Sequence, residues 1–117
     1  MGDLSKHFSR SEFMCKCGGC TCDTVDAELI RVLEGIRRHF DKPVSITSGV
    51  RCKHHNKAVG GSEQSQHLLG RAADILVDGV SPKTVQEYIN GKFEDWYGLG
   101  CYPHFTHIDT RRTRARW

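Results

Sequence analysis

Two histidines and one aspartate, His67, Asp74 and His107, are the side chains of this sequence best suited to act together chemically. A borderline-soft cation such as zinc favours imidazole nitrogens combined with a carboxylate oxygen. Three protein ligands leave a fourth position for a reactive water, as in catalytic zinc sites. The residue types therefore predict one catalytic zinc ion held by these three side chains, provided that the fold brings them together.

Two of these three ligands fall on segments that the sequence pattern predicts as strands. Residues 72–77 are almost entirely apolar, which indicates a buried strand, and Asp74 is the one charge in it. A carboxylate on a buried strand needs a compensating partner, and a cation is the obvious one. A further strand is expected over residues 105–110, where alternation places His107 and Asp109 on the same face.

Two helices are expected beside these strands. Residues 26–40 repeat apolar side chains at helical spacing, and residues 41–43, which finish with a proline, end this helix. A second helix is expected to begin at Ser81, an N-cap followed by a proline, and to run to about Asn90. Gly91 is expected to end it.

The other segments complete the expected fold. Residues 44–48 alternate and are rich in β-branched side chains, which predicts a strand. A capping box formed by Ser9 and Glu12 predicts a short helical turn. Residues 52–64 have no periodicity and are expected to be irregular. Helices and strands follow no βαβ order, so the expected fold class is α+β.

Length and charge limit the classes of protein. The 117 residues and 13.2 kDa predict a single domain over 1–117, with an N-terminal turn and Cys-rich loop in 1–25 and a catalytic core in 26–117. The net charge of +3 is mild, so no nucleic-acid partner is expected. The arginines in residues 111–116 are expected to attract an anionic cell-wall polymer or to be solvated. No apolar stretch approaches the roughly 18 residues of a membrane span.

The first residues of the chain contain no hydrophobic signal segment. We therefore expect synthesis in a cytoplasm, and delivery by another route if the target lies outside the membrane. Nothing in the sequence indicates an oligomer, and a monomer is expected.

The cysteines leave several interpretations open. Four of the six lie within eight residues, and the full set is Cys15, Cys17, Cys20, Cys22, Cys52 and Cys101. The clustered four could form disulfides after export, remain reduced thiols, or hold a second zinc ion. Their spacing differs from the paired Cys-x-x-Cys of common zinc ribbons, which favours disulfides or thiols over a second metal.

The segment around the first two ligands resembles the signature of peptidase family M15, the zinc D-Ala-D-Ala carboxypeptidases. The matching residues of that signature are Ser65, His67, Gly70, Ala72 and Asp74. Further matches are Ser48-Gly49-Val50-Arg51, Asn56, Gly60-Gly61 and Phe105-Thr106-His107-Ile108-Asp109. The resemblance covers residues 44–117, and it is nearest to short phage- and bacterial-type members that end in a basic segment and a tryptophan.

This resemblance implies a fold and a ligand set. The fold is a small antiparallel sheet flanked by helices, like that of hedgehog and the DD-peptidases, with zinc at the base of a cleft. The ligands implied by the family are His67, Asp74 and His107, the same three side chains that the residue types favour.

The resemblance also implies roles for the residues around the metal. Relatives often carry an acidic general base three positions before the last ligand, where this chain has His104. Histidine transfers protons near neutral pH, so His104 is the first candidate base, with Asp109 as the second. Asp109 would alternatively orient a ligand. Arg51 is expected to bind a substrate carboxylate or stabilise the oxyanion, and Ser65 and Gln66 to bind substrate backbone.

Together these features predict zinc-dependent hydrolysis of amide bonds in bacterial peptidoglycan peptides by a D,D-carboxypeptidase or endopeptidase. A phage or prophage endolysin, acting in cell wall degradation, fits the absence of a signal segment. The alternative is a zinc-stabilised module of the same fold that binds cell wall or protein without turnover, because position 104 is not acidic. A third interpretation is a small nucleic-acid-binding protein that uses the cysteines and the basic tail.

Overall fold

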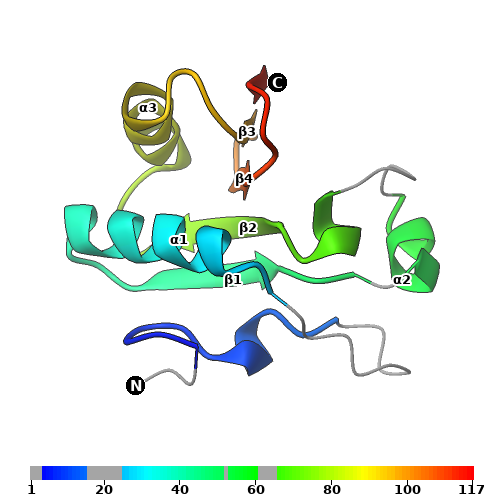
Figure 1. The fold of residues 1–117 in the computed structure, drawn as a ribbon. Coiled ribbons are helices and arrows are strands. Elements are labelled where there is room, and N and C mark those ends of the chain that lie inside the picture. The colour runs from blue at the N-terminus through cyan, green and yellow to red at the C-terminus, as the bar shows by residue number, and fades with distance from the viewer. Residues whose placement is uncertain (1–3, 16–24, 52, 61–65) are drawn as a thin grey trace.

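The computed structural model describes residues 4–15, 25–51, 53–60 and 66–117. Its helical elements are η1 (Arg10–Glu12), α1 (Ala27–Phe40), α2 (Lys53–Ala58), η2 (Gln66–Leu69) and α3 (Pro82–Lys92). Its strands are β1 (Val44–Ser48), β2 (Ala72–Val77), β3 (Gly98–Cys101), β4 (Thr106–Asp109) and β5 (Ala115–Arg116). This is the α+β class that the sequence predicts (Figure 1).

The five strands form one sheet in the order β1-β2-β4-β3-β5. Neighbouring strands are antiparallel from β1 through β3, but β5 pairs with β3 in parallel. The expectation of a wholly antiparallel sheet is therefore wrong, and the sheet is mixed. The chain reverses after β4 and returns along the outer edge of β3, so β5 runs in the same direction as β3.

The hydrophobic core lies on the face of the sheet that α1 and α3 cover. Alternation along β2 sends Ala73, Ile75 and Val77 into this core, while β4 contributes Ile108. Figure 1 shows α1 lying across β1 and β2, with α3 further along the sheet. The opposite face of β2 and β4 is then left for polar side chains, which include Asp74 and His107.

The two main helices begin where the sequence predicts. Asp26 precedes α1 as its N-cap, and the helix ends at Asp41, which adopts a left-handed conformation. The Ser81 side chain accepts a hydrogen bond from the Thr84 N–H at the start of α3. The expected stop at Gly91 is wrong by two residues, because α3 continues through Lys92 and its C-cap is Phe93.

The sequence prediction missed four elements, namely α2, η2, β3 and β5. Residues 53–58 form the helix α2, although residues 52–64 were expected to be irregular. The strand β3 contains two glycines, which disfavour strands, and β5 is only two residues long. In each case the element depends on contacts with distant residues, which local propensity does not reveal.

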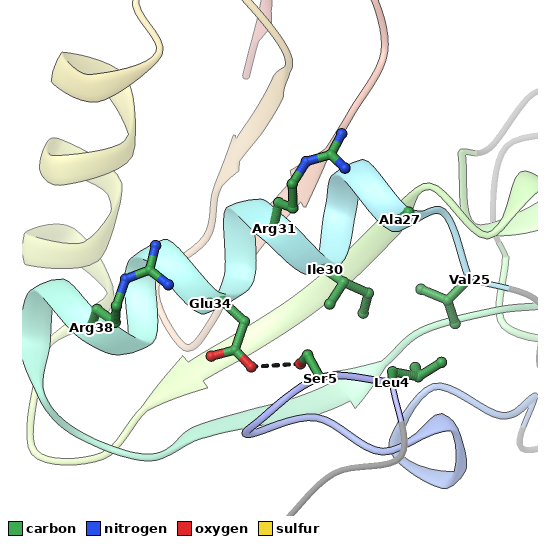
Figure 2. A pocket seen from close by; sticks show the side chains of 8 residues that line it. All are labelled: Leu4, Ser5, Val25, Ala27, Ile30, Arg31, Glu34 and Arg38. Atoms are coloured by element: carbon green, nitrogen blue, oxygen red, sulfur yellow. Dashed lines mark hydrogen bonds between the residues drawn. The ribbon is translucent and has the colours of Figure 1, made fainter.

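The N-terminal segment is fastened to the outer side of α1. The carboxylate of Glu34 accepts hydrogen bonds from the Ser5 hydroxyl at 2.5 Å and from the His7 backbone N–H at 2.8 Å. His7 Nδ1 lies 2.6 Å from the same carboxylate. Figure 2 shows Glu34 and Ser5 on one side of a pocket between this segment and α1, with Arg31 further along the helix.

The capping box predicted at the start of η1 is present, since the Ser9 N–H donates to the Glu12 carboxylate at 2.6 Å. Within the described residues, no helix has the length and apolar character needed to cross a membrane.

Candidate metal centre

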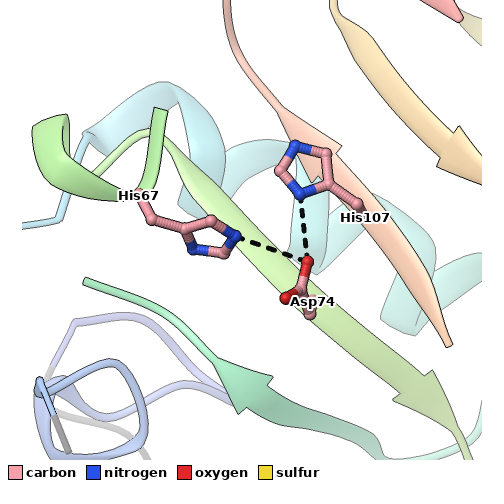
Figure 3. Close-up of side chains that lie close together, drawn as sticks. All are labelled: His67, Asp74 and His107. Carbon is pink, nitrogen blue, oxygen red and sulfur yellow. Dashed lines mark hydrogen bonds and ion pairs between the residues drawn. The ribbon is translucent and has the colours of Figure 1, made fainter. Parts of the chain in front are cut away.

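Three buried side chains from separate parts of the chain meet on the polar face of the sheet. One ligand atom from each of His67, Asp74 and His107 lies within 4.8 Å of the other two. Asp74 Oδ1 is 3.4 Å from His67 Nε2 and 3.0 Å from His107 Nδ1. Figure 3 shows both imidazoles directed toward this one carboxylate. The fold therefore brings together the three residues that the sequence analysis selected.

The sheet register places two of these residues side by side. Asp74 on β2 and His107 on β4 are direct cross-strand partners, so their side chains project from the same face. His67 comes from η2, whose end is formed by Gly70 at a φ of 68°, a conformation that favours glycine. The backbone N–H of Arg51 donates to the His67 carbonyl at 3.0 Å and ties η2 to the segment after β1.

The outer nitrogens of both histidines are held by oxygen acceptors. His67 Nδ1 lies 2.6 Å from the Gly49 carbonyl, and His107 Nε2 lies 2.7 Å from Asp109 Oδ2. A carbonyl oxygen only accepts, so the ring proton of neutral His67 is on Nδ1, and the Asp109 carboxylate favours the proton of His107 on Nε2. The nitrogens that face Asp74 are then available as ligands. Such outer hydrogen bonds are typical of metal-binding histidines.

The charges at the site favour a cation. Burial raises the pKa of Asp74, but hydrogen bonds from His107 and His67 outweigh burial and hold its pKa at about 2. Burial lowers the pKa of His107, whereas its hydrogen bonds to Asp109 and Asp74 raise it more. Both shifts favour a positive charge beside Asp74. A divalent cation would supply such a charge, and the donor set suits zinc.

A family model described as Peptidase M15 matches residues 6–109 of the chain. The chain belongs to the peptidase M15 family. Among curated proteins, no relative matches it. Membership makes this chain a metallopeptidase in general terms, with a peptide as its substrate and with a donor set that could bind the zinc on which M15 peptidases depend.

Among the carboxylates of the described residues of this M15 peptidase, Asp109 is the most enclosed, with none of its surface exposed. Its Oδ1 accepts hydrogen bonds from the Gly98 N–H and from both the backbone N–H and Nε of Arg111. Its Oδ2 faces His107 Nε2 and accepts from Arg111 Nη2. Burial raises the pKa of Asp109, but hydrogen bonds from His107 and Arg111 outweigh burial and keep the carboxyl well below its usual range.

The strand β3 makes room for this carboxylate because it carries glycines opposite the ligand strand. Gly98 pairs with Asp109 and Gly100 pairs with His107. A Cβ on Gly98 would overlap both carboxylate oxygens of Asp109, and a Cβ on Gly100 would come within 2.9 Å of His107 Cβ. The sequence analysis did not identify Gly98, Gly100 or Arg111 as parts of the site. The only local signal is the alternation of glycines in residues 98–100.

Arg51 reaches the same centre from the segment after β1. Its Nη2 lies 3.5 Å from Asp74 Oδ2, on the other side of the carboxylate from the two histidines. Its Nη1 donates to Asn56 Oδ1 at 3.3 Å and its Nε to Ser48 Oγ at 3.2 Å. The family motif residues around Arg51 thus support the guanidinium, and part of its side chain, 15%, is open to solvent.

The other predicted site residues are His104, Gln66 and Ser65, together with the cysteines. His104 is exposed in the connection between β3 and β4. Gln66 lies at the start of η2, and its Oε1 is buried without a hydrogen-bond donor in the described part of the chain. Ser65 lies outside the described residues. The clustered Cys17, Cys20 and Cys22, and also Cys52, lie outside them too, while Cys15 is buried and Cys101 exposed.

Two of the tail arginines make hydrogen bonds within the fold, although their side chains remain partly exposed. Arg111 binds Asp109 as described, and Arg116 donates through Nη2 to the Phe93 carbonyl at 2.7 Å and through Nη1 to the Tyr97 carbonyl at 2.8 Å. Arg116 thereby satisfies carbonyl groups beyond the end of α3.

Proposed function

We propose that this M15 peptidase hydrolyses amide bonds in the peptides of bacterial peptidoglycan, as a D,D-carboxypeptidase or endopeptidase, with one zinc ion bound by His67, Asp74 and His107. The observation that carries the proposal is the convergence of these three ligand atoms within 4.8 Å of one another. Zinc bound there would supply Lewis acidity, which polarises a peptide carbonyl and lowers the pKa of a coordinated water.

Arg51 is the residue that we assign to substrate binding. A guanidinium binds a carboxylate or a developing oxyanion through paired hydrogen bonds. The Arg51 side chain lies beside Asp74 and is held by Ser48 and Asn56, so it is already oriented before substrate arrives. Removing Arg51 should therefore weaken the productive binding of substrate more than the binding of zinc.

Proton transfer is assigned to His104, and orientation of a ligand to Asp109. Both oxygens of Asp109 already accept hydrogen bonds from buried or half-buried donors, which disfavours a role as a base that takes up a proton. His104 is exposed, precedes His107 by three positions, and carries an imidazole, the side chain that most often acts as a general acid or base. Gln66, and with it Ser65, is proposed to contact the backbone of the bound peptide.

The proposal is tested by digesting purified sacculi or their muropeptides with protein loaded with one equivalent of zinc. Mass spectrometry of the products identifies the bond that is cut. Activity should disappear with a chelator and return when zinc is restored, and Asp74→Ala should be inactive. Intact muropeptides after incubation with fully metallated protein would refute the proposed hydrolysis.

One observation favours a second candidate, a zinc-stabilised module that binds cell wall or protein without turnover. The position that relatives often fill with an acidic base is the exposed His104, and the two carboxylates of the centre, Asp74 and Asp109, are both engaged. In a catalyst, His104→Ala should abolish or strongly reduce turnover while zinc stays bound. In a binding module, the metallated wild type should retain sacculi on sedimentation yet release no peptide.

We also propose that the protein is phage- or prophage-encoded, is made in the cytoplasm and acts on the cell wall, as a lysis enzyme or as a component carried by a virion.

A further inference from the structure

A group of aromatic rings lies directly beside the metal centre. We call Tyr102, Phe105 and Trp117 the aromatic wall. The indole of Trp117 lies with its ring centre 5.1 Å from that of His107, tilted by 47°. Trp117 Nε1 donates to the Tyr102 hydroxyl at 2.9 Å, and the Tyr102 ring stacks on Phe105 at 4.4 Å. The wall is therefore one connected unit that begins at a candidate metal ligand.

The sheet contains a feature that lets the indole reach this position. Gly100 lies on β3 opposite His107, and a Cβ there would come within 2.9 Å of Trp117 Nε1 and 2.8 Å of Tyr102 Cε2. The missing side chain leaves the space through which Trp117 crosses β3. The backbone of Trp117 is fixed as well, because its N–H donates to the Leu99 carbonyl and its carbonyl accepts from the Cys101 N–H.

The wall is anchored but not buried. Trp117 is 48% exposed and Tyr102 is 37% exposed, although the adjoining His107 is only 8% exposed. A tryptophan that served only to support the ligand would bury its ring to gain hydrophobic stabilisation. An indole held by hydrogen bonds at both its backbone and its Nε1 but left half open next to a reactive centre indicates a surface prepared for a ligand.

A cation completes this surface. The guanidinium carbon of Arg111 lies 5.0 Å from the centre of the Trp117 ring, within cation–π range. Arg111 uses Nε and Nη2 on Asp109, whereas its Nη1 makes no hydrogen bond to another described residue. The wall thus combines half-exposed aromatic rings with a guanidinium over the Trp117 ring, whose Nη1 has no hydrogen-bond acceptor within the described residues.

We propose that the aromatic wall binds the substrate peptide, with Trp117 packing against the residue next to the bond that is cut. This inference rests on the proposed function and adds a specificity-determining residue to it. One residue of extended peptide spans about 3.3–3.6 Å, so the residue adjoining a carbonyl at the metal falls within reach of an indole whose centre is 5.1 Å from the His107 ring.

The chemistry of the wall also points to the kind of residue it accepts. A half-exposed aromatic ring suits a small aliphatic side chain such as the methyl group of alanine. The nearby Arg111 Nη1 suits a carboxylate on the same residue or the next one. Peptides rich in alanine and carboxylates, as in peptidoglycan stems, have this composition.

The first test compares Trp117→Ala and Trp117→Phe with the wild type on muropeptides. We expect Trp117→Ala to raise KM by about tenfold or more, and Trp117→Phe to restore most of the loss, because a ring remains. The matched control is Trp96→Ala, since Trp96 is the only other tryptophan and is 59% exposed between α3 and β3. Zinc content should equal that of the wild type in all three variants.

Two results would overturn the substrate contact. Values of kcat and KM for Trp117→Ala within twofold of the wild type would show that the indole does not contribute to substrate binding. Loss of zinc from Trp117→Ala and Trp117→Phe in parallel with activity would show that the ring only supports His107.

A second measurement separates this inference from the proposed hydrolysis. In the Trp96→Phe variant Trp117 is the only tryptophan, so its fluorescence reports on the wall alone. Addition of a purified muropeptide pool to the zinc-loaded variant should shift or quench this emission in a saturable manner, even if no peptide is cut. An emission unchanged at saturating muropeptide would overturn the wall, whether or not hydrolysis is observed.

Discussion

Replacing Asp109 with asparagine tests how the centre is built, because the change keeps the shape of the side chain and alters only its hydrogen bonding. The carboxylate faces only donors: the Gly98 N–H, three groups of Arg111 and His107 Nε2. An asparagine has one oxygen, which accepts hydrogen bonds, and one NH₂ group, which donates them. Because all the surrounding groups are donors, the NH₂ group must face donors on one side. The oxygen should take the side with three donors, which leaves the NH₂ facing His107.

The consequence for His107 is a change of tautomer. An NH₂ group beside Nε2 favours a lone pair on that nitrogen, and the ring proton then moves to Nδ1, the atom that lies 3.0 Å from Asp74. Metal binding must expel this proton or turn the ring. Losing such an outer partner costs about 10- to 100-fold in metal affinity, which corresponds to about 1.4–2.7 kcal/mol. We expect a loss of zinc affinity within this range for Asp109→Asn.

The measurement is a competition titration of zinc against a chelating dye, with circular dichroism and thermal unfolding to establish that the variant is folded. Asp78→Asn is the matched control, because Asp78 is exposed in the turn after β2 and should bind zinc as the wild type does. A folded Asp109→Asn protein with wild-type zinc affinity would refute the tautomer argument and the role of Asp109 in orienting His107.

Three further outcomes follow from the same contacts. Asp74→Ala should take up no zinc at the centre, measured as metal content after gel filtration, and a wild-type stoichiometry would contradict the ligand assignment. Gly98→Ala should lower the free energy of unfolding by about 1–3 kcal/mol, because the new Cβ overlaps the Asp109 carboxylate. Gly35→Ala in α1 should raise it by about 0.5–1 kcal/mol, because the new Cβ meets nothing within 4 Å. Denaturant unfolding measures both changes. Burial raises the pKa of Glu34, but hydrogen bonds from Ser5 and His7 lower it more. The Glu34 carboxylate therefore stabilises the fold at pH values above its ordinary pKa of 4.5. This stabilisation is lost as the pH falls through the lower pKa of the folded state. In Glu34→Gln, Tm should therefore fall less steeply as the pH is lowered into the acid range. A pH dependence of Tm equal to that of the wild type would contradict a stabilising contact between Glu34 and the N-terminal residues Ser5 and His7.

The choice of the three ligands could be predicted because it depends on local patterns and motifs, whereas their convergence depends on the fold that brings η2, β2 and β4 together. A charge in the apolar segment 72–77 marks Asp74 as a residue that needs a partner, and alternation fixes which of its neighbours share its face. The helix α1 is equally local, because a periodic apolar stripe specifies both the helix and the side that it buries. The predicted and observed elements agree where the residues that form the sequence pattern are the same residues that the element buries.

The support of the site could not be predicted, because it depends on strand pairing and on burial that exist only in the folded chain. β3 is poor in strand-forming residues, and it forms because its backbone pairs with both β4 and β5. The short α2 has too few residues to be stable alone, and its Asn56 is buried where it accepts a hydrogen bond from Arg51. Arg111 belongs to a run of charges that suggests a solvated tail, but its partner Asp109 becomes visible only in the fold.

The core and the metal centre are built on the same pair of strands, and this arrangement explains how a small sheet can hold the ligands in place. On β2 and β4, Ile75 and Ile108 are buried against the helices, while the intervening Asp74 and His107 project to the other face. Any shift in the register of these strands would move apolar side chains out of the core, so the energy that fixes the core also fixes the ligand positions. The glycines of β3 leave room for the Asp109 side chain of β4 beside Gly98 without disturbing that register. The ligand positions are thus fixed by burial of apolar side chains on the opposite face of the sheet. The chemistry of the centre depends on the hydrogen bonds to Asp109, for which the glycines of β3 leave room.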